Sequence, residues 1–148
     1  TGTIMNLAGS ARSLLMTVIA IAIIISAFGI INTLLMSVNE RTREFGMMKA
    51  IGASGLDIGR MVLAETVFIT LSGGAVGMAA AGLGSSLIEG YVRGMLPYSP
   101  RGSLISISPE LALFSIGFSL LLGLVCGIYP AWKSSRLTPM QAIRSGVE

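Results

Sequence analysis

The fold of this chain is decided by the stretch from Asn39 to Ser54, which reads Asn-Glu-Arg-Thr-Arg-Glu-Phe-Gly-Met-Met-Lys-Ala-Ile-Gly-Ala-Ser. It is the one dense cluster of charge in the sequence, and it lies between two long apolar runs. Its apolar residues recur at the spacing of a helix face, which predicts a short amphipathic helix over residues 40–52. Its charged residues are Glu40, Arg41, Arg43, Glu44 and Lys49, and its apolar side holds Phe45, Met47, Met48 and Ile51.

The composition is that of a membrane protein. Only 11% of the 148 residues are charged and 53% are hydrophobic, with a mean hydropathy of +0.82, whereas soluble domains carry about 25% charged residues. The length leaves room for a few spanning helices and their loops. The net charge of +3 comes from basic residues that flank apolar runs. Membrane topology explains them better than a nucleic-acid partner does.

Three runs without charge, residues 13–39, 66–88 and 111–132, are long enough to cross the bilayer as helices. We expect spans over residues 14–38, 58–88 and 109–132. The predicted fold class is therefore an all-α membrane protein with a short helix between its first two spans. Ser54 with Asp57 is typical of a capping box that opens the second span. Ser108, Pro109 and Glu110 are typical of the start of the third.

Proline and glycine residues mark the remaining boundaries. They predict a loop over residues 89–108, and Pro130 is expected to end or kink the third span. The basic tail, residues 133–148, is expected to form a short helix that begins after Thr138 and carries Met140 and Ile143 on one side.

The second expected span is rich in small residues. Gly73, Gly77 and Ala81 fall one helical turn apart on one face, which in lipid would let another helix approach closely. The alternative is that glycine is simply common in spanning helices. The density of small residues here favours a packing face.

Basic residues predict the orientation. Seven lie in the first connection and the tail, and three lie on the other side: Arg41, Arg43, Lys49, Arg60, Lys133, Arg136 and Arg144 against Arg12, Arg93 and Arg101. The excess predicts that the helix over 40–52 and the tail are cytoplasmic. The N-terminus is then extracytoplasmic, and since no signal peptide is evident, we expect the chain to be part of something longer.

Catalytic and metal-binding motifs are absent from the sequence. There is no G-x-x-x-x-G-K-[ST] phosphate loop, no H-E-x-x-H, no G-x-S-x-G and no C-x-x-C. The single cysteine, Cys126, lies in an apolar run, where a buried small hydrophobe is the expected role. The chain is therefore not expected to be an enzyme or to bind a metal or cofactor itself.

The helix over residues 40–52 can be interpreted in three ways. It could be a solvated loop that only sets topology, a helix that lies on lipid headgroups, or a helix that contacts a protein. Its apolar side argues against the first, because these residues need a partner. Periodicity does not decide between the other two.

Two motifs in this chain resemble those of the FtsX-like permease family, and within it the MacB-type branch. The stretch 39–54 resembles the family's E-R-x-R-E-[IF]-G segment and its [AL]-[ILV]-G-A-S ending. Pro-Ala-Trp-Lys-Ser-Ser-Arg-Leu-Thr-Pro-Met-Gln-Ala-Ile-Arg, residues 130–144, resembles the family's closing motif. The resemblance covers residues 14–144. Trp132 and Lys133 replace the usual basic or small pair, and Gln141 stands where the family usually has an acid.

The resemblance implies the permease of an ATP-binding-cassette (ABC) transporter that transmits mechanical motion. Such permeases have a first span, a large extracytoplasmic domain and then a block of three spans, and this chain looks like that block. Residues 1–12 would be the end of an extracytoplasmic stalk that continues the first span. Permeases of this family act as dimers in the bacterial inner membrane, with MgATP bound by partner ATPases. A periplasmic adaptor or an outer-membrane channel would be a further partner.

In that frame the short helix lies on the ATPase. Phe45, Met48 and Ile51 would fill an apolar groove of the ATPase, and Gly52 would let the chain turn into the second span. The charged residues around them would set the register at the rim: Glu40, Arg41, Arg43, Glu44 and Lys49. The work done would be efflux or export of drugs, peptides or lipoproteins. The alternative is a membrane signalling or scaffold subunit that regulates cell-wall hydrolases or senses antimicrobial peptides.

Overall fold

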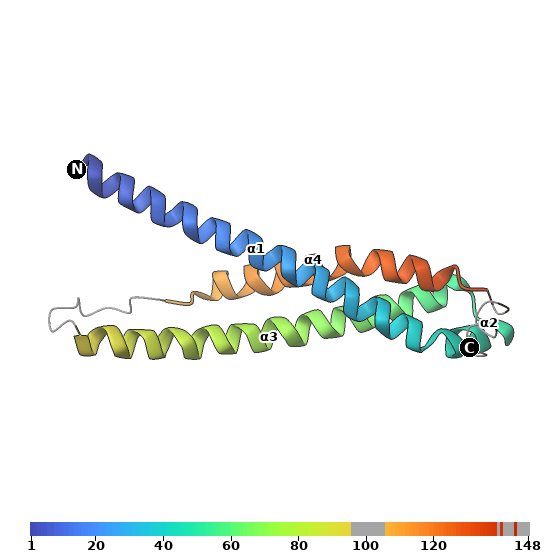
Figure 1. The fold of residues 1–148 in the computed structure, drawn as a ribbon. Coiled ribbons are helices and arrows are strands. Elements are labelled where there is room, and N and C mark those ends of the chain that lie inside the picture. The colour runs from blue at the N-terminus through green and yellow to red at the C-terminus, as the bar shows by residue number, and fades with distance from the viewer. Residues whose placement is uncertain (96–105, 139, 141–143, 145–148) are drawn as a thin grey trace. The chain divides into compact units, whose positions relative to one another are not determined.

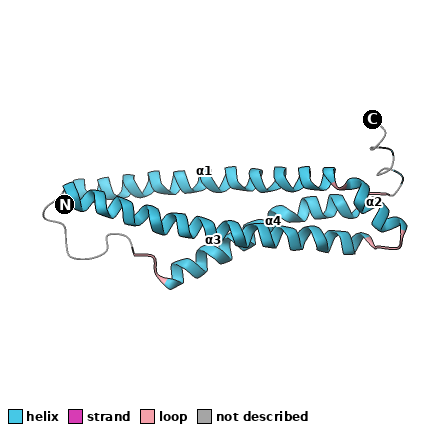
Figure 2. Cartoon of the chain, turned by 90° about the horizontal axis from the view of Figure 1, so that it is seen from below, coloured by secondary structure: helices cyan, strands magenta, loops and turns pink. Residues whose placement is uncertain are grey.

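The computed structural model describes residues 1–95, 106–138, 140 and 144. Within these residues, four helices are defined along the chain (Figure 1): α1 (Gly2–Glu40), α2 (Thr42–Ala50), α3 (Gly55–Met95) and α4 (Pro109–Ser135). Over the described residues the chain is helical apart from short connections (Figure 2). Three of the helices, α1, α3 and α4, are long and apolar enough to cross a membrane. The predicted all-α membrane fold is therefore confirmed.

Helix α1 is one uninterrupted helix of 39 residues. At a rise of 1.5 Å per residue it is about 58 Å long, roughly twice the thickness of a bilayer core. Its large hydrophobic side chains are mostly exposed, and only Leu34 and Val38 are buried within the chain. The expected continuation of the first span through residues 1–12 is thus confirmed as helix.

Helix α3 is longer than the sequence predicted. It begins at Gly55 and runs to Met95, so the expected loop over 89–108 is wrong for residues 89–95. The helix continues because no proline interrupts it there, and an Arg93–Glu89 ion pair at 3.4 Å adds support one turn apart. The rest of the expected loop up to residue 105 lies outside the described residues.

Both predicted helix starts are confirmed. The Asp57 N–H donates to Ser54 Oγ at 3.2 Å while the Ser54 N–H donates to Asp57 Oδ2 at 3.0 Å, which is a reciprocal capping box. At α4 the Leu111 N–H donates to Ser108 Oγ at 3.2 Å. These caps satisfy backbone donors that a helix start leaves without an intrahelical partner.

The end of α4 lies five residues beyond the proline that was expected to mark it. Pro130 is buried inside the helix, which continues to Ser135. A proline costs one backbone hydrogen bond but its φ suits a helix, and side-chain hydroxyls add bonds just beyond it. Ser134 Oγ donates to Ala131 O at 2.8 Å, and Ser135 Oγ donates to Trp132 O at 2.7 Å. Most of the helix expected after Thr138 lies outside the described residues, although Met140 and Arg144 are helical.

The chain divides into two compact units. The first joins residues 1–62 to residues 126–148, and the second is residues 63–125. The first unit therefore contains α1, α2, the first two turns of α3 and the last turns of α4. The second contains the rest of α3 and α4.

Candidate functional site

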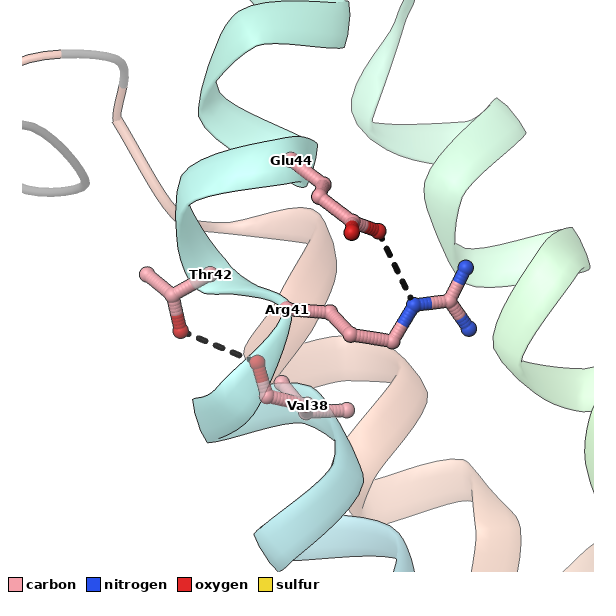
Figure 3. A network of polar contacts seen from close by, with 4 residues as sticks. All are labelled: Val38, Arg41, Thr42 and Glu44. Atoms are coloured by element: carbon pink, nitrogen blue, oxygen red, sulfur yellow. Dashed lines mark hydrogen bonds and ion pairs between the residues drawn. The ribbon is translucent and has the colours of Figure 1, made fainter.

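Helix α2 follows α1 with a break of one residue. Arg41 has φ −99° and ψ 10°, outside the helical range of its neighbours. The chain is held on both sides of this break: Thr42 Oγ1 donates to Val38 O at 2.9 Å, and Arg41 Nε pairs with Glu44 Oε2 at 3.2 Å (Figure 3). The Arg41 guanidinium also lies 5.5 Å from the centre of the Phe45 ring. The start of α2 is thus tied to the end of α1.

Phe45 is buried within the chain. Its side chain is only 1% exposed, and Gly46 beside it is also buried. The first unit buries further residues from the other three helices: Leu34, Val38, Ile58, Val62, Cys126, Pro130, Ala131 and Ser134. The interpretation that Phe45 fills a groove on a partner is therefore wrong for this structure. A helix face whose apolar residues recur at helical spacing can be buried against other helices of the same chain. The large aromatic ring of Phe45 contributes most to the hydrophobic stabilisation from that burial.

The outer side of α2 carries the exposed apolar residues. Ile51 is 89% exposed and Met47 is 54% exposed, while Met48 is half-buried. Three charged residues of the predicted set are also exposed: Arg43 and Glu44 in α2, and Glu40 at the end of α1. We call Met47 and Ile51 the α2 apolar surface. It places an apolar patch among charges, which is the arrangement of a contact surface with a polar rim.

The end of α2 is a tight turn that needs a glycine. The Gly52 N–H donates to Lys49 O at 3.2 Å and the Ala53 N–H donates to Met48 O at 2.9 Å, which is the hydrogen-bond pattern of a Schellman motif. Gly52 has φ +112°, a backbone conformation that residues with a side chain rarely adopt. The expected turn at Gly52 is confirmed, and it holds Ile51 outward at the end of the helix.

Lys49 is engaged within the chain. Its Nζ lies 2.5 Å from Ser135 O and 2.5 Å from Leu137 O, where α4 ends. A cation at a helix C-terminus satisfies carbonyl groups and suits the helix dipole. The sequence prediction placed Lys49 at the rim of a partner contact, but in this structure its ammonium group is held by α4.

Within the second unit, α3 and α4 pack through small residues. Ser119 Oγ donates to Thr70 O at 3.1 Å, and a Cβ added at Gly74 would lie 3.2 Å from Ser119 Oγ. A Cβ added at Gly123 would lie 2.0 Å from Thr70 Cγ2. The Thr70 hydroxyl in turn donates to Thr66 O at 2.9 Å. Gly123 and Thr70 therefore set how closely these two helix segments approach.

The predicted packing face of Gly73, Gly77 and Ala81 is not used in this way. All three are exposed, and no other part of the described chain comes within 4 Å of a Cβ added at Gly73 or Gly77. The face that packs against α4 is the neighbouring one, which contains Gly74. Gly73, Gly77 and Ala81 remain predicted to receive a helix from outside this chain.

Several important residues were missed at the level of sequence. Thr70 and Gly123 pack α3 against α4, and Thr66 is fully buried one turn before Thr70. Gly55 and Ser135 bring the start of α3 to the end of α4. The signal for Thr66 and Thr70 was present: two hydroxyl residues one turn apart in an apolar run indicate an interhelical or back-bonded position. Nothing in the local sequence pairs Gly123 with Thr70.

These features define a membrane protein with three spanning-length helices and a short charged helix anchored to its own chain by one face and exposed by the other. The chain belongs to the FtsX-like permease family, because the family model described as FtsX-like permease C-terminal matches residues 16–139. The resemblance predicted from the two motifs is thereby confirmed.

Curated relatives agree with this family. The chain is 42% identical over 131 residues to the "Macrolide export ATP-binding/permease protein MacB" of Bdellovibrio bacteriovorus, covering 88% of this chain and 19% of that protein. It is 39% identical over 144 residues to the protein of the same name from Syntrophobacter fumaroxidans, covering 97% and 19%. It is 32% identical over 140 residues to the "Uncharacterized ABC transporter permease YknZ" of Bacillus subtilis, covering 92% and 33%. The chain thus spans a fifth to a third of the length of these relatives.

Proposed function

We propose that this chain is the membrane part of an ABC transporter permease whose α2 docks on a partner ATPase. ATP binding and hydrolysis in that partner, with MgATP as its ligand, would move α2 and so drive work outside the membrane. The observation that supports this most is the two-sided character of α2. Phe45 fixes one face in the protein, while Met47 and Ile51 offer an apolar surface on the other.

Docking on a protein accounts for the α2 apolar surface better than lipid contact does. A helix that lies on lipid headgroups presents a continuous apolar face to the membrane. Here the largest apolar residue of α2 is buried in the chain, and the exposed patch is small and terminal, with the exposed charged residues Arg43 and Glu44 on the same helix. Charges around an apolar centre give register and specificity to a protein contact.

The wider arrangement follows from the same proposal. The excess of basic residues near α2 and in the tail supports a cytoplasmic position for α2 at a bacterial inner membrane, where ATP is available. The open face of Gly73, Gly77 and Ala81 would receive a helix of a second permease copy. The ATPase would be a fused domain or a separate subunit, and an adaptor or outer-membrane channel would continue the export path.

The cargo is proposed from the relatives. Two of them are named for macrolide export, which favours efflux or export of drug-like compounds over the signalling or scaffold role. Peptides and lipoproteins are further candidate cargoes of such a permease. Movement of a labelled macrolide in vesicles that depends on MgATP would support export. ATP-dependent regulation with no such movement would support the signalling alternative.

Ile51→Asp tests the docking directly in the full-length protein with its ATPase. We expect membrane insertion and thermal stability to be retained, because Ile51 is 89% exposed, and ATPase stimulation by the permease to be lost. Thr138→Asp is the matched control: it adds the same charge at an exposed residue on the same proposed side. If Ile51→Asp and Thr138→Asp stimulate the ATPase as well as the unmodified protein, α2 does not dock through this surface.

A further inference from the structure

The end of α4 is contacted at one carbonyl by two other helices. Ser135 O accepts a hydrogen bond from Lys49 Nζ of α2, and it would lie 2.5 Å from a Cβ added at Gly55, the first residue of α3. One turn further along α3, a Cβ added at Gly59 would lie 3.6 Å from Ala131 O of α4. All of these residues belong to the first compact unit. The three helix ends are thus joined at Ser135.

This junction is closed by Lys49. The last backbone bonds at the end of α4 are long: the Arg136 N–H to Lys133 O distance is 3.3 Å, and the Leu137 N–H to Ser134 O distance is 3.4 Å. The carbonyls of Ser135 and Leu137, which follow them, both accept from the Lys49 ammonium. A charge-assisted hydrogen bond is roughly twice as strong as a neutral one. Lys49 therefore stabilises the part of α4 that its own backbone holds least well.

Lys49 also links α2 to a segment that is distant in the sequence. It lies 86 residues from Ser135 and 88 from Leu137, and it stands in the last turn of α2, two residues before the exposed Ile51. A partner that pushed on the α2 apolar surface would therefore move the Lys49 ammonium with it. Since that ammonium binds α4 carbonyls, the displacement would reach the end of the last span without passing along α3.

We propose that Lys49 is a positioning residue that transmits movement of α2 to the C-terminal end of α4. The proposal rests on the proposed function, because it takes the partner ATPase as the source of the movement. It changes the role of Lys49 from a rim charge that faces the partner to an internal connection. Arg43, which is exposed on the same helix, keeps the predicted rim role.

Hydrogen–deuterium exchange on the full-length transporter with its ATPase tests this. Exchange is compared between the nucleotide-free protein and the protein trapped with MgATP and vanadate, in peptides that cover α2 and residues 131–137. In the unmodified protein both peptides should change their exchange on trapping. In Lys49→Met the α2 peptide should still respond, whereas the response of residues 131–137 should be lost. Nucleotide-free exchange of those residues should also rise roughly tenfold or more.

Matched variants separate the proposed connection from a general effect of charge. Lys49→Arg retains a cationic donor and should keep the α4 response. Lys133→Met removes an exposed lysine from the last turn of α4 and should also keep it. If Lys49→Met does not assemble, Lys49→Gln, which keeps a shorter neutral donor, should weaken the response of residues 131–137 relative to Lys49→Arg.

The outcomes distinguish the two proposals. If α2 does not respond to trapping even in the unmodified protein, the proposed docking of α2 fails. If α2 responds and residues 131–137 respond equally in the Lys49→Met and unmodified proteins, the docking stands and the role of Lys49 is overturned. An exchange increase at residues 131–137 without any loss of the trapping response would also overturn it, because Lys49 would then only stabilise the helix end.

Discussion

Replacing Gly123 by alanine should destabilise the packing of α3 against α4 strongly for so small a change. The new Cβ would lie 2.0 Å from Thr70 Cγ2, 2.8 Å from Thr70 Cβ and 2.9 Å from Thr70 Oγ1. Rotation of the threonine does not relieve this clash, because its Cβ is itself too close. Rotation would also disturb the hydrogen bonds from Thr70 Oγ1 to Thr66 O at 2.9 Å and to Val67 O at 3.1 Å. The helices must therefore move apart.

The expected loss of stability in Gly123→Ala follows from overpacking. An extra methyl group in a well-packed interior costs about 1–3 kcal/mol, from which up to about 1 kcal/mol is recovered because alanine favours helix over glycine. Gly77→Ala is the matched control. A Cβ there meets no other part of the described chain within 4 Å, so only the helix-propensity gain remains. The two identical substitutions should thus shift stability in opposite directions.

The assay is thermal unfolding of the full-length protein in detergent, with Thr70→Ala and the double variant Thr70→Ala/Gly123→Ala completing a double-mutant cycle. Thr70→Ala removes Cγ2, the atom nearest to the new Cβ, and Oγ1, but it keeps the Cβ that would lie 2.8 Å away. It should therefore restore part of the stability that Gly123→Ala loses. Equal unfolding temperatures for Gly123→Ala and Gly77→Ala would refute the contact. A double variant no more stable than Gly123→Ala would show that the clash lies elsewhere.

Two further substitutions test the anchoring of α2. Gly52→Ala should lower the free energy of unfolding by about 1–2 kcal/mol through backbone strain alone, because φ is +112° while no atom obstructs the Cβ. A Gly52→Asn variant that is more stable than Gly52→Ala in thermal unfolding would agree with this. An unchanged stability of Gly52→Ala would contradict it. Phe45→Ala should lower the free energy of unfolding by about 3–5 kcal/mol because the ring is 1% exposed. Ile51→Ala, at an exposed position, should leave thermal stability nearly unchanged. Equal losses for the two variants would place Phe45 outside the core.

The helices themselves follow from local rules that a single sequence carries. The length of the uncharged runs predicts α1, α3 and α4, and the Ser54–Asp57 and Ser108–Leu111 caps were found because both partners lie within one turn. The helix ends were less accurate. The Arg93–Glu89 pair extends α3, and serine hydroxyls carry α4 past Pro130.

The site was predicted less completely because its decisive contacts are distant in sequence. Periodicity groups Phe45 with Ile51 on one broad side of α2, but it does not say which of them the chain itself buries. From the sequence, Lys49 looks like a charged residue at the rim of a partner contact. Only the fold brings Ser135, 86 residues away, into contact with it. Likewise the sequence does not distinguish Gly73 from Gly74, but of these two glycines only Gly74 faces Ser119 of α4.

Site-specific cross-linking tests whether an ATPase docks on the exposed side of α2. In the full-length protein with Cys126 and any other native cysteine replaced by serine, a single cysteine at Ile51 carries a short photoactivated cross-linker, and a single cysteine at Thr138 serves as the control. We expect a cross-link from Ile51 to the ATPase whose yield changes when MgATP is added, and a much lower yield from Thr138. Cross-linking of Ile51 to lipid alone, with no ATPase captured in any nucleotide state, would contradict it.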